Sequence, residues 1–193
     1  MAIFGKPPID PATLASEIVS GLRREKSLDG RRWNTKVKDV VRGLADRKRC
    51  LVHPNPEEKD CGSEWLFDVV WFAREGGSIH LAVEVELRRK GDVLCDFQKL
   101  LCIKAPLKVM VYRDRDGKGS LVRSIEEYME EFDQHVKGEH YLLVEMAPIP
   151  PDRACLYKVR QDGRQTNVKF LPLNLRKATG HSEEHSGNSL PVS

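Results

Sequence analysis

Apolar residues recur every three or four positions in two N-terminal stretches, the spacing of one face of an α-helix. The first stretch follows Asp10-Pro11, where an aspartate cap precedes a proline at the first helical position, and it predicts a helix to about Arg24. The second stretch follows Asn34, which we expect to cap another helix. Its apolar positions are Val37, Val40, Val41 and Leu44.

The pattern then changes to compact apolar runs, which are typical of strands. Residues 64–72 and 79–87 form two such runs, and Gly76-Gly77 between them predicts an antiparallel hairpin. A short strand is expected before the hairpin, at about residues 50–52, and it ends at the breaker Pro54-Asn55-Pro56.

Helical and strand patterns alternate after the hairpin. A helix is expected from about Val93 to Lys104, where Ala105-Pro106 ends it, and a strand follows at residues 107–112. Ser124 with Glu127 three residues later is a capping box, which predicts the start of another helix. The inward positions of that helix are expected to be Ile125, Tyr128, Met129, Phe132 and Val136. Further strands are expected at residues 140–146, 154–160 and 166–172, the last two joined at the hairpin signal Asp162-Gly163.

This order of elements predicts an α/β protein in which helices flank a mixed sheet. Residues 1–176 are expected to form a single domain, because the chain is long enough for one substantial core. Residues 177–193 are rich in Ser, Gly, His and Glu without periodicity, and we expect them to be a disordered tail.

Three acidic residues lie within the two apolar runs of the hairpin. Asp68 is surrounded by apolar neighbours, and Glu84 and Glu86 share one face of the second run because side chains alternate along a strand. Carboxylates on apolar strands are costly unless they are paired or bound. If the hairpin register brings Asp68 beside Glu84, the oxygens suit Mg²⁺ or Mn²⁺. The alternative is that these acids merely lie on the wet face of a half-exposed sheet.

Lys99 lies on the helix that follows the hairpin. On a helical wheel it points away from the apolar face, but Cys95 and Cys102 flank it, so its own face is not simply polar. A lysine near paired carboxylates would stabilise transition-state charge or orient an attacking water. A solvated lysine is the other interpretation.

Composition adds an uneven distribution of charge. The chain has 40% hydrophobic residues and a net charge of +3, but residues 23–49 hold eleven Lys or Arg against four acids. This basic segment, together with 88–90, favours a polyanionic partner such as nucleic acid, with a solvated helical face as the alternative. The expected phosphate contacts are Arg31, Arg32, Lys36, Lys38, Arg42, Arg88, Arg89 and Lys90.

Five cysteines form no Cys-x2-Cys pair, and their odd number argues against a complete disulfide framework. Cys50 and His53, with Cys61 nearby, are a partial match to a zinc cluster that lacks a fourth ligand at a recognisable spacing. Buried, reduced cysteines are the preferred interpretation. No apolar run reaches membrane-spanning length and the N-terminus does not resemble a signal peptide, so a cytoplasmic location is expected.

The order of these features resembles the PD-(D/E)xK nuclease superfamily. Asp68 matches the aspartate of the motif and Glu84 its acidic residue, while Glu86 stands where the usual lysine would be. Some members carry the lysine on the following helix, and Lys99 is the candidate here. The resemblance covers roughly residues 34–113 and implies a restriction-endonuclease-like fold, an α-β-β-β-α-β core, with an extra C-terminal helix and strands.

The resemblance implies a metal-dependent nuclease that hydrolyses phosphodiester bonds in DNA or RNA. Asp68 and Glu84 bind Mg²⁺ or Mn²⁺ in this interpretation, Glu86 is a further metal ligand or positions water, and Lys99 is the catalytic cation. The alternative is a non-catalytic module that binds nucleic acid or a protein on a degenerate version of the same fold. A third possibility is an unrelated α/β protein whose acids lie far apart. A homodimer is compatible with each.

Overall fold

The structure is a computed structural model, and it describes residues 9–25, 33–54, 66–73, 77–115, 119–146, 151–162 and 165–171. Its elements in chain order are α1 (Pro11–Arg24), α2 (Trp33–Lys48), β1 (Leu51–His53), β2 (Val69–Phe72), β3 (Ile79–Glu86), α3 (Lys90–Cys102), β4 (Leu107–Tyr112), α4 (Ser120–Glu131), β5 (His140–Met146), β6 (Pro151–Asp162) and β7 (Gln165–Leu171). The predicted tail and the expected phosphate contacts Arg31 and Arg32 lie outside the described residues.

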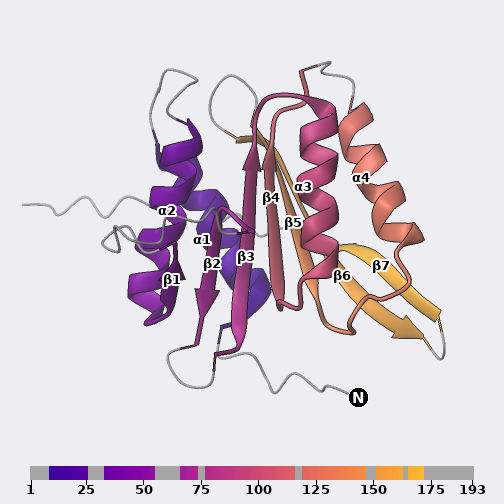
Figure 1. Cartoon of the computed structure of the whole chain (residues 1–193), viewed down its shortest axis with the longest axis horizontal. Coiled ribbons are helices and arrows are strands. Elements are labelled where there is room, and N and C mark those ends of the chain that lie inside the picture. The colour runs from indigo at the N-terminus through magenta and orange to yellow at the C-terminus, as the bar shows by residue number, and fades with distance from the viewer. Residues whose placement is uncertain are drawn as a thin grey trace, which may run out of the picture.

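All seven described strands form one mixed sheet, in which their spatial order is their order along the chain. The strands β3, β4 and β5 are parallel to one another, and the outer pairs are antiparallel. The helices α3 and α4 are the crossovers between the parallel strands (Figure 1). The predicted α/β class and mixed sheet are therefore confirmed, and the stretch from α2 to β4 has the order α-β-β-β-α-β.

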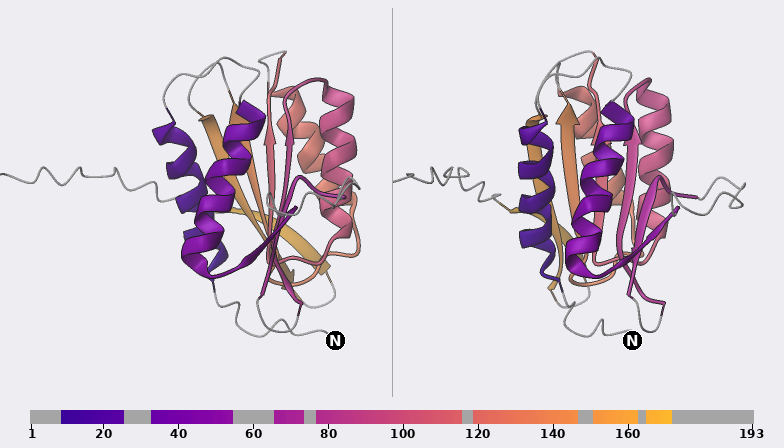
Figure 2. Two further views of the ribbon diagram at one scale, coloured as in Figure 1. Left: turned by 60° about the vertical axis from the view of Figure 1, so that its left-hand side comes forward. Right: turned by 90° about the vertical axis from the view of Figure 1, so that its left-hand side faces the viewer.

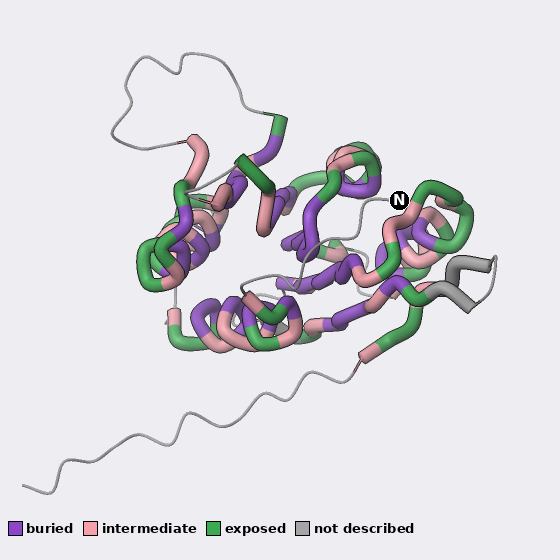
Figure 3. The backbone as a smooth tube through the Cα atoms, turned by 90° about the horizontal axis from the view of Figure 1, so that it is seen from below, coloured by how far each residue is buried: buried purple, intermediate pink, exposed green. Residues whose placement is uncertain are grey.

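Helices cover both faces of the sheet, so the molecule has three layers (Figure 2). Because side chains alternate along each strand, the sheet supplies two separate apolar cores. Val83 and Val109 belong to the core beneath α1 and α2, and Ala82 and Met110 belong to the core beneath α3 and α4. Each helix buries the side that faces the sheet (Figure 3). Any acid on the Ala82 face of β3 must therefore lie beneath α3.

The N-terminal helix has the predicted bounds, whereas three other helix starts differ from expectation. Asp10 caps α1 by accepting the Thr13 N–H at 2.8 Å. The prediction that Asn34 caps the second helix is wrong, because α2 begins at Trp33 and the Asn34 amide instead donates to the Val85 carbonyl at 3.1 Å. That contact joins α2 to β3, which a local pattern does not reveal. The helix expected from about Val93 begins three residues earlier.

The capping box predicted at Ser124 is also wrong. The helix α4 begins at Ser120, after Gly119 in a left-handed conformation, and the Ser124 hydroxyl donates to the Ser120 carbonyl within the helix. The helix ends at Glu131, so Val136 lies beyond it. The strands β4 and β5 have the predicted bounds, whereas β2 begins only at Val69 within the apolar run 64–72. Asp68 is the residue just before β2.

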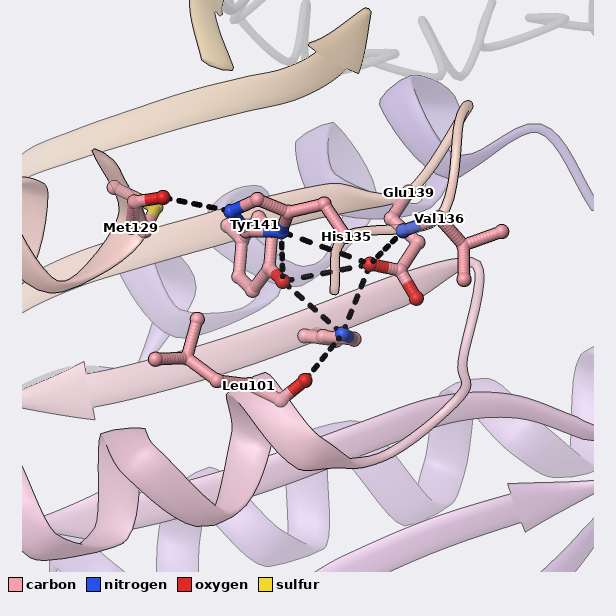
Figure 4. A network of polar contacts seen from close by, with 7 residues as sticks. Leu101, Met129, His135, Val136, Glu139 and Tyr141 are labelled. Carbon is pink, nitrogen blue, oxygen red and sulfur yellow. Dashed lines mark hydrogen bonds and ion pairs between the residues drawn. The ribbon is translucent and has the colours of Figure 1, made fainter. Parts of the chain in front are cut away.

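A buried polar network ties the sheet to the ends of α3 and α4 (Figure 4). Lys108 is 1% exposed, and its ammonium donates to Glu139 Oε2 at 3.0 Å, Tyr141 Oη at 3.0 Å and the Leu101 carbonyl at 3.3 Å. Burial lowers the pKa of Lys108, and the contact with Glu139 opposes that shift. The three acceptors fill the donors of the ammonium, so the charge is fully paired within the fold.

The same network fixes the tautomer of His135. Its Nε2 lies 2.7 Å from the Met129 carbonyl, which can only accept, so Nε2 carries the proton. Its Nδ1 lies 3.0 Å from Tyr141 Oη and accepts the hydroxyl proton. Burial lowers the pKa of His135 and favours this neutral ring. A closed chain of donors and acceptors with this little exposure is structural.

Removing one partner of this network should strongly destabilise the protein. Lys108→Met leaves the Glu139 carboxylate buried without its cation, and we expect a loss of about 3–5 kcal/mol in the free energy of unfolding. Urea denaturation measures it, with exposed Lys104→Met as the matched control, expected to change stability by less than about 0.5 kcal/mol. Equal effects of the two variants would show that the network contributes little.

Two helical glycines should respond oppositely to alanine. A Cβ at Gly21 would lie 2.7 Å from Val40 Cγ1, where α1 meets α2, whereas a Cβ at Gly43 would have no neighbour within 4 Å. Gly43→Ala should raise the free energy of unfolding by about 0.5–1 kcal/mol, because it limits the unfolded chain and favours the helix. Gly21→Ala should lower it by about 1 kcal/mol or more through overpacking. Thermal denaturation of both variants checks the pair, and stabilisation by Gly21→Ala would contradict it.

Candidate active site

The register of the hairpin brings two of the predicted acids together. Val69 pairs with Val83 in the antiparallel ladder, so one step further places Asp68 opposite Glu84. The Oδ2 atom of Asp68 accepts the backbone N–H of Val85 at 2.8 Å, which fixes the Asp68 carboxylate against β3. The third possibility predicted that the two acids lie far apart, and that expectation is wrong for Asp68 and Glu84. Whether the chain is related to the nuclease superfamily stays a prediction.

Glu84 lies on the face of β3 that α3 covers, and it is only 3% exposed. Burial raises the pKa of Glu84 to about 7, the negative charges of Asp68 and Asp96 act in the same direction, and the attraction of Lys99 opposes the shift without overcoming it. A carboxyl group in this position is therefore divided between its neutral and ionised forms near neutral pH.

Lys99 reaches from α3 to Glu84. Its Nζ atom lies 2.6 Å from Glu84 Oε1, 2.8 Å from Asp96 Oδ1 and 3.3 Å from the Leu66 carbonyl, to which it donates a hydrogen bond. Partial burial disfavours the ammonium, but the contacts with Asp96 and Glu84 outweigh burial and raise the pKa of Lys99. The lysine is thus held charged above the carboxylate pair, and the interpretation of it as merely solvated is wrong.

Lys38 approaches Asp68 from the opposite layer. Its Nζ atom lies 2.6 Å from Asp68 Oδ1, and both side chains are 24% exposed. Sequence reasoning assigned Lys38 to phosphate contacts and did not connect it with Asp68, because their contact depends on how α2 packs across the edge of the sheet. It also omitted Asp96 from the site, although its spacing three residues before Lys99 on one helix was a usable signal.

Glu86 is the last residue of β3, and it contacts Arg88 in the loop that follows. It is 6% exposed, and its Oε1 atom accepts the Arg88 backbone N–H at 2.6 Å, with the Arg88 guanidinium 3.4 Å away. Arg88 is exposed and faces this carboxylate. In the described part of the chain, no three His, Cys, Asp or Glu side chains come together as a group that could hold a metal ion. A role for Glu86 as a third ligand stays a prediction.

The other expected phosphate contacts have varied surroundings. Lys36 lies 3.7 Å from Glu25, and Arg89 and Lys90 are exposed at the start of α3. Arg42 is half-buried on α2, and its Nε atom is buried without an acceptor among the residues described. The geometry of these residues alone does not identify any of them as a phosphate contact, so these roles stay predictions.

The cysteines offer no second site among the described residues. Cys50 and Cys155 are buried, as preferred, but Cys95 and Cys102 are exposed, so the expectation of burial is wrong for the α3 pair. Cys61, the third member of the possible zinc cluster, lies outside the described residues. No described helix is long and apolar enough to cross a membrane.

Comparison with known proteins supplies no further identification: the chain matches no protein-family model, no curated protein and no solved structure. The function of the chain is therefore inferred from the geometry of Asp68, Glu84 and the two lysines that contact them.

The raised pKa of Glu84 predicts how stability depends on pH. Because the folded-state pKa lies near 7 and the unfolded value near 4.5, the folded protein binds more protons between these pH values. The free energy of unfolding should therefore fall as pH rises from about 4.5 to 7, by at most about 3 kcal/mol from this group. Urea denaturation without divalent metal measures the trend.

Glu84→Gln should flatten this part of the pH profile, because an amide does not titrate in that range. The matched control is Glu127→Gln on the exposed side of α4, which removes the same charge away from the site. A Glu84→Gln profile that is parallel to the wild-type profile would show that Glu84 has an ordinary pKa.

Proposed function

We propose that the chain is a metal-dependent, nuclease-like protein that hydrolyses phosphodiester bonds in DNA or RNA, on a restriction-endonuclease-like fold. The observation that carries the proposal is the Lys99 ammonium 2.6 Å from Glu84, in a hairpin whose register sets Asp68 opposite Glu84. The α-β-β-β-α-β order from α2 to β4 supports the resemblance to the PD-(D/E)xK superfamily. A cytoplasmic location stays a prediction from the sequence.

The donor set fits Mg²⁺ or Mn²⁺. Glu84 Oε1 is buried and lies 2.6 Å from the Lys99 ammonium, which leaves the second oxygen of the Glu84 carboxylate for an ion. This second oxygen, on β3, and Asp68 Oδ1, just before β2, are hard ligands of the type these ions prefer. When bound, such an ion polarises a phosphodiester and lowers the pKa of a coordinated water.

The protein's own residues supply orientation and charge. The Val85 N–H holds Asp68 against the strand, so one oxygen of the carboxylate has a defined direction. Lys99 is held by Asp96 on its own helix, and its ammonium is positioned to stabilise negative charge that develops on the phosphate in the transition state. Asp96 is thus a positioning residue for Lys99.

The charge balance of the cluster favours a second candidate, a non-catalytic binding module. Each predicted acid has a basic partner in the structure, Lys38 for Asp68, Lys99 for Glu84 and Arg88 for Glu86. An ion cluster that satisfies its own charges is stable without metal, which is the state expected of a degenerate site. Measurements of cleavage and of metal binding separate the two candidates.

Cleavage of supercoiled plasmid and RNA with Mn²⁺ tests the enzyme. We expect Asp68→Asn, Glu84→Gln and Lys99→Met each to lower the rate by roughly 100-fold or more, because each removes a ligand or a charge that acts in the transition state. Asp92→Asn and Lys104→Met make the same chemical changes at exposed positions and should cleave at the wild-type rate. Intact substrate together with no Mn²⁺ binding by the wild type would exclude the enzyme and leave the binding module.

A further inference from the structure

Lys38 occupies the oxygen of Asp68 that a metal ion would need. Asp68 Oδ2 is already held by the Val85 N–H at 2.8 Å, and Oδ1 lies 2.6 Å from the Lys38 ammonium. A divalent ion bound to Asp68 would lie close to the Lys38 ammonium, and the two positive charges would repel each other. Binding of metal at Asp68 therefore favours the withdrawal of Lys38.

Lys38 is suited to such a movement. It is about one-quarter exposed, and its ammonium sits on a flexible four-carbon stem, so it can leave Asp68 without disturbing the core. Lys99 differs, because Asp96 and the Leu66 carbonyl hold it in addition to Glu84. Of the two lysines, Lys38 is the exchangeable one.

Arg42 supplies a second positive group on the same side of α2 as Lys38. It lies four residues after Lys38 and therefore one turn along the same side of α2. Its Nε–H is buried and has no acceptor among the residues described. A guanidinium donor fork matches the oxygens of a phosphate.

We propose that Lys38 is an exchangeable internal cation, which neutralises Asp68 until a divalent metal ion binds and then contacts a phosphate of the nucleic acid beside Arg42. This inference rests on the proposed function and adds a coupling: metal binding creates part of the phosphate-binding surface. By linkage, a bound phosphate backbone in turn favours the metal-bound site.

The first test is calorimetric titration of the full chain with Mn²⁺ in the absence of nucleic acid. Lys38→Met removes the competing cation, so we expect Mn²⁺ affinity to rise by roughly threefold or more. Arg42→Met is the matched control, because it removes one positive charge from the same side of α2 without freeing Asp68, and its affinity should stay near the wild-type value. Lys38→Arg, which keeps a competing cation, should also resemble the wild type.

The second test measures binding of a short fluorescent oligonucleotide with hydrolysis-resistant phosphorothioate linkages. With a chelator present, Lys38→Met should bind it as the wild type does, because Lys38 is then held by Asp68. With saturating Mn²⁺, the same variant should bind roughly threefold or more weakly than the wild type. Arg42→Met should weaken binding under both conditions, because its donor is never held by Asp68.

The outcomes separate this inference from the proposed function. If neither the wild type nor Lys38→Met binds Mn²⁺, the metal-dependent function fails. If the wild type binds Mn²⁺ and Lys38→Met binds it equally or more weakly, the exchange fails while the function stands. An equal loss of oligonucleotide binding by Lys38→Met with and without metal would also overturn the exchange, because it would make Lys38 a permanent phosphate contact.

Discussion

The requirement to neutralise Glu84 organises this end of the molecule. A carboxyl group on the covered face of a central strand is tolerated only if it is protonated or matched by a cation, and Glu84 has access to both solutions. The crossover from β3 through α3 to β4 lays α3 over that face, which brings Lys99 above Glu84. The hairpin of β2 and β3 places Asp68 opposite Glu84 from the other direction.

The cluster differs in kind from the network around Lys108. Lys108 and Glu139 are 1% and 2% exposed, and every donor of the ammonium has an acceptor, so that pair joins elements and cannot meet a substrate. Lys99 keeps about a third of its side-chain surface exposed, so this ion pair is accessible to solvent whereas the Lys108 pair is not. We propose on this ground that the cluster around Glu84, rather than the Lys108 network, is the functional site.

The sequence predicts the elements that depend on a local hydrophobic pattern. It does not predict the contacts between a helix layer and the sheet. The strands at residues 107–112 and 140–146 were predictable because they are continuous apolar runs, and the neighbourhood of Asp68 and Glu84 followed from the hairpin register. The start of α4 was not predictable from Ser124, because the helix begins after Gly119, which adopts a left-handed backbone conformation. The hydrogen bond from Asn34 to β3 and the ion pair between Lys38 and Asp68 could not be predicted from local sequence patterns. Both contacts depend on how α2 packs against the sheet.

The balance of charge sets the central question about this site. When Glu84 is protonated, the carboxylates of Asp68, Glu86 and Asp96 face the cations of Lys38, Arg88 and Lys99, so the formal charges cancel. Ionisation of Glu84 leaves one excess negative charge in a partly buried place, which a divalent ion would offset only if a lysine also withdrew. The release of Lys38 that we propose would restore this balance when an ion binds, but the binding of Mn²⁺ itself, rather than the mobility of Lys38, separates a nuclease from a self-neutralised binding module.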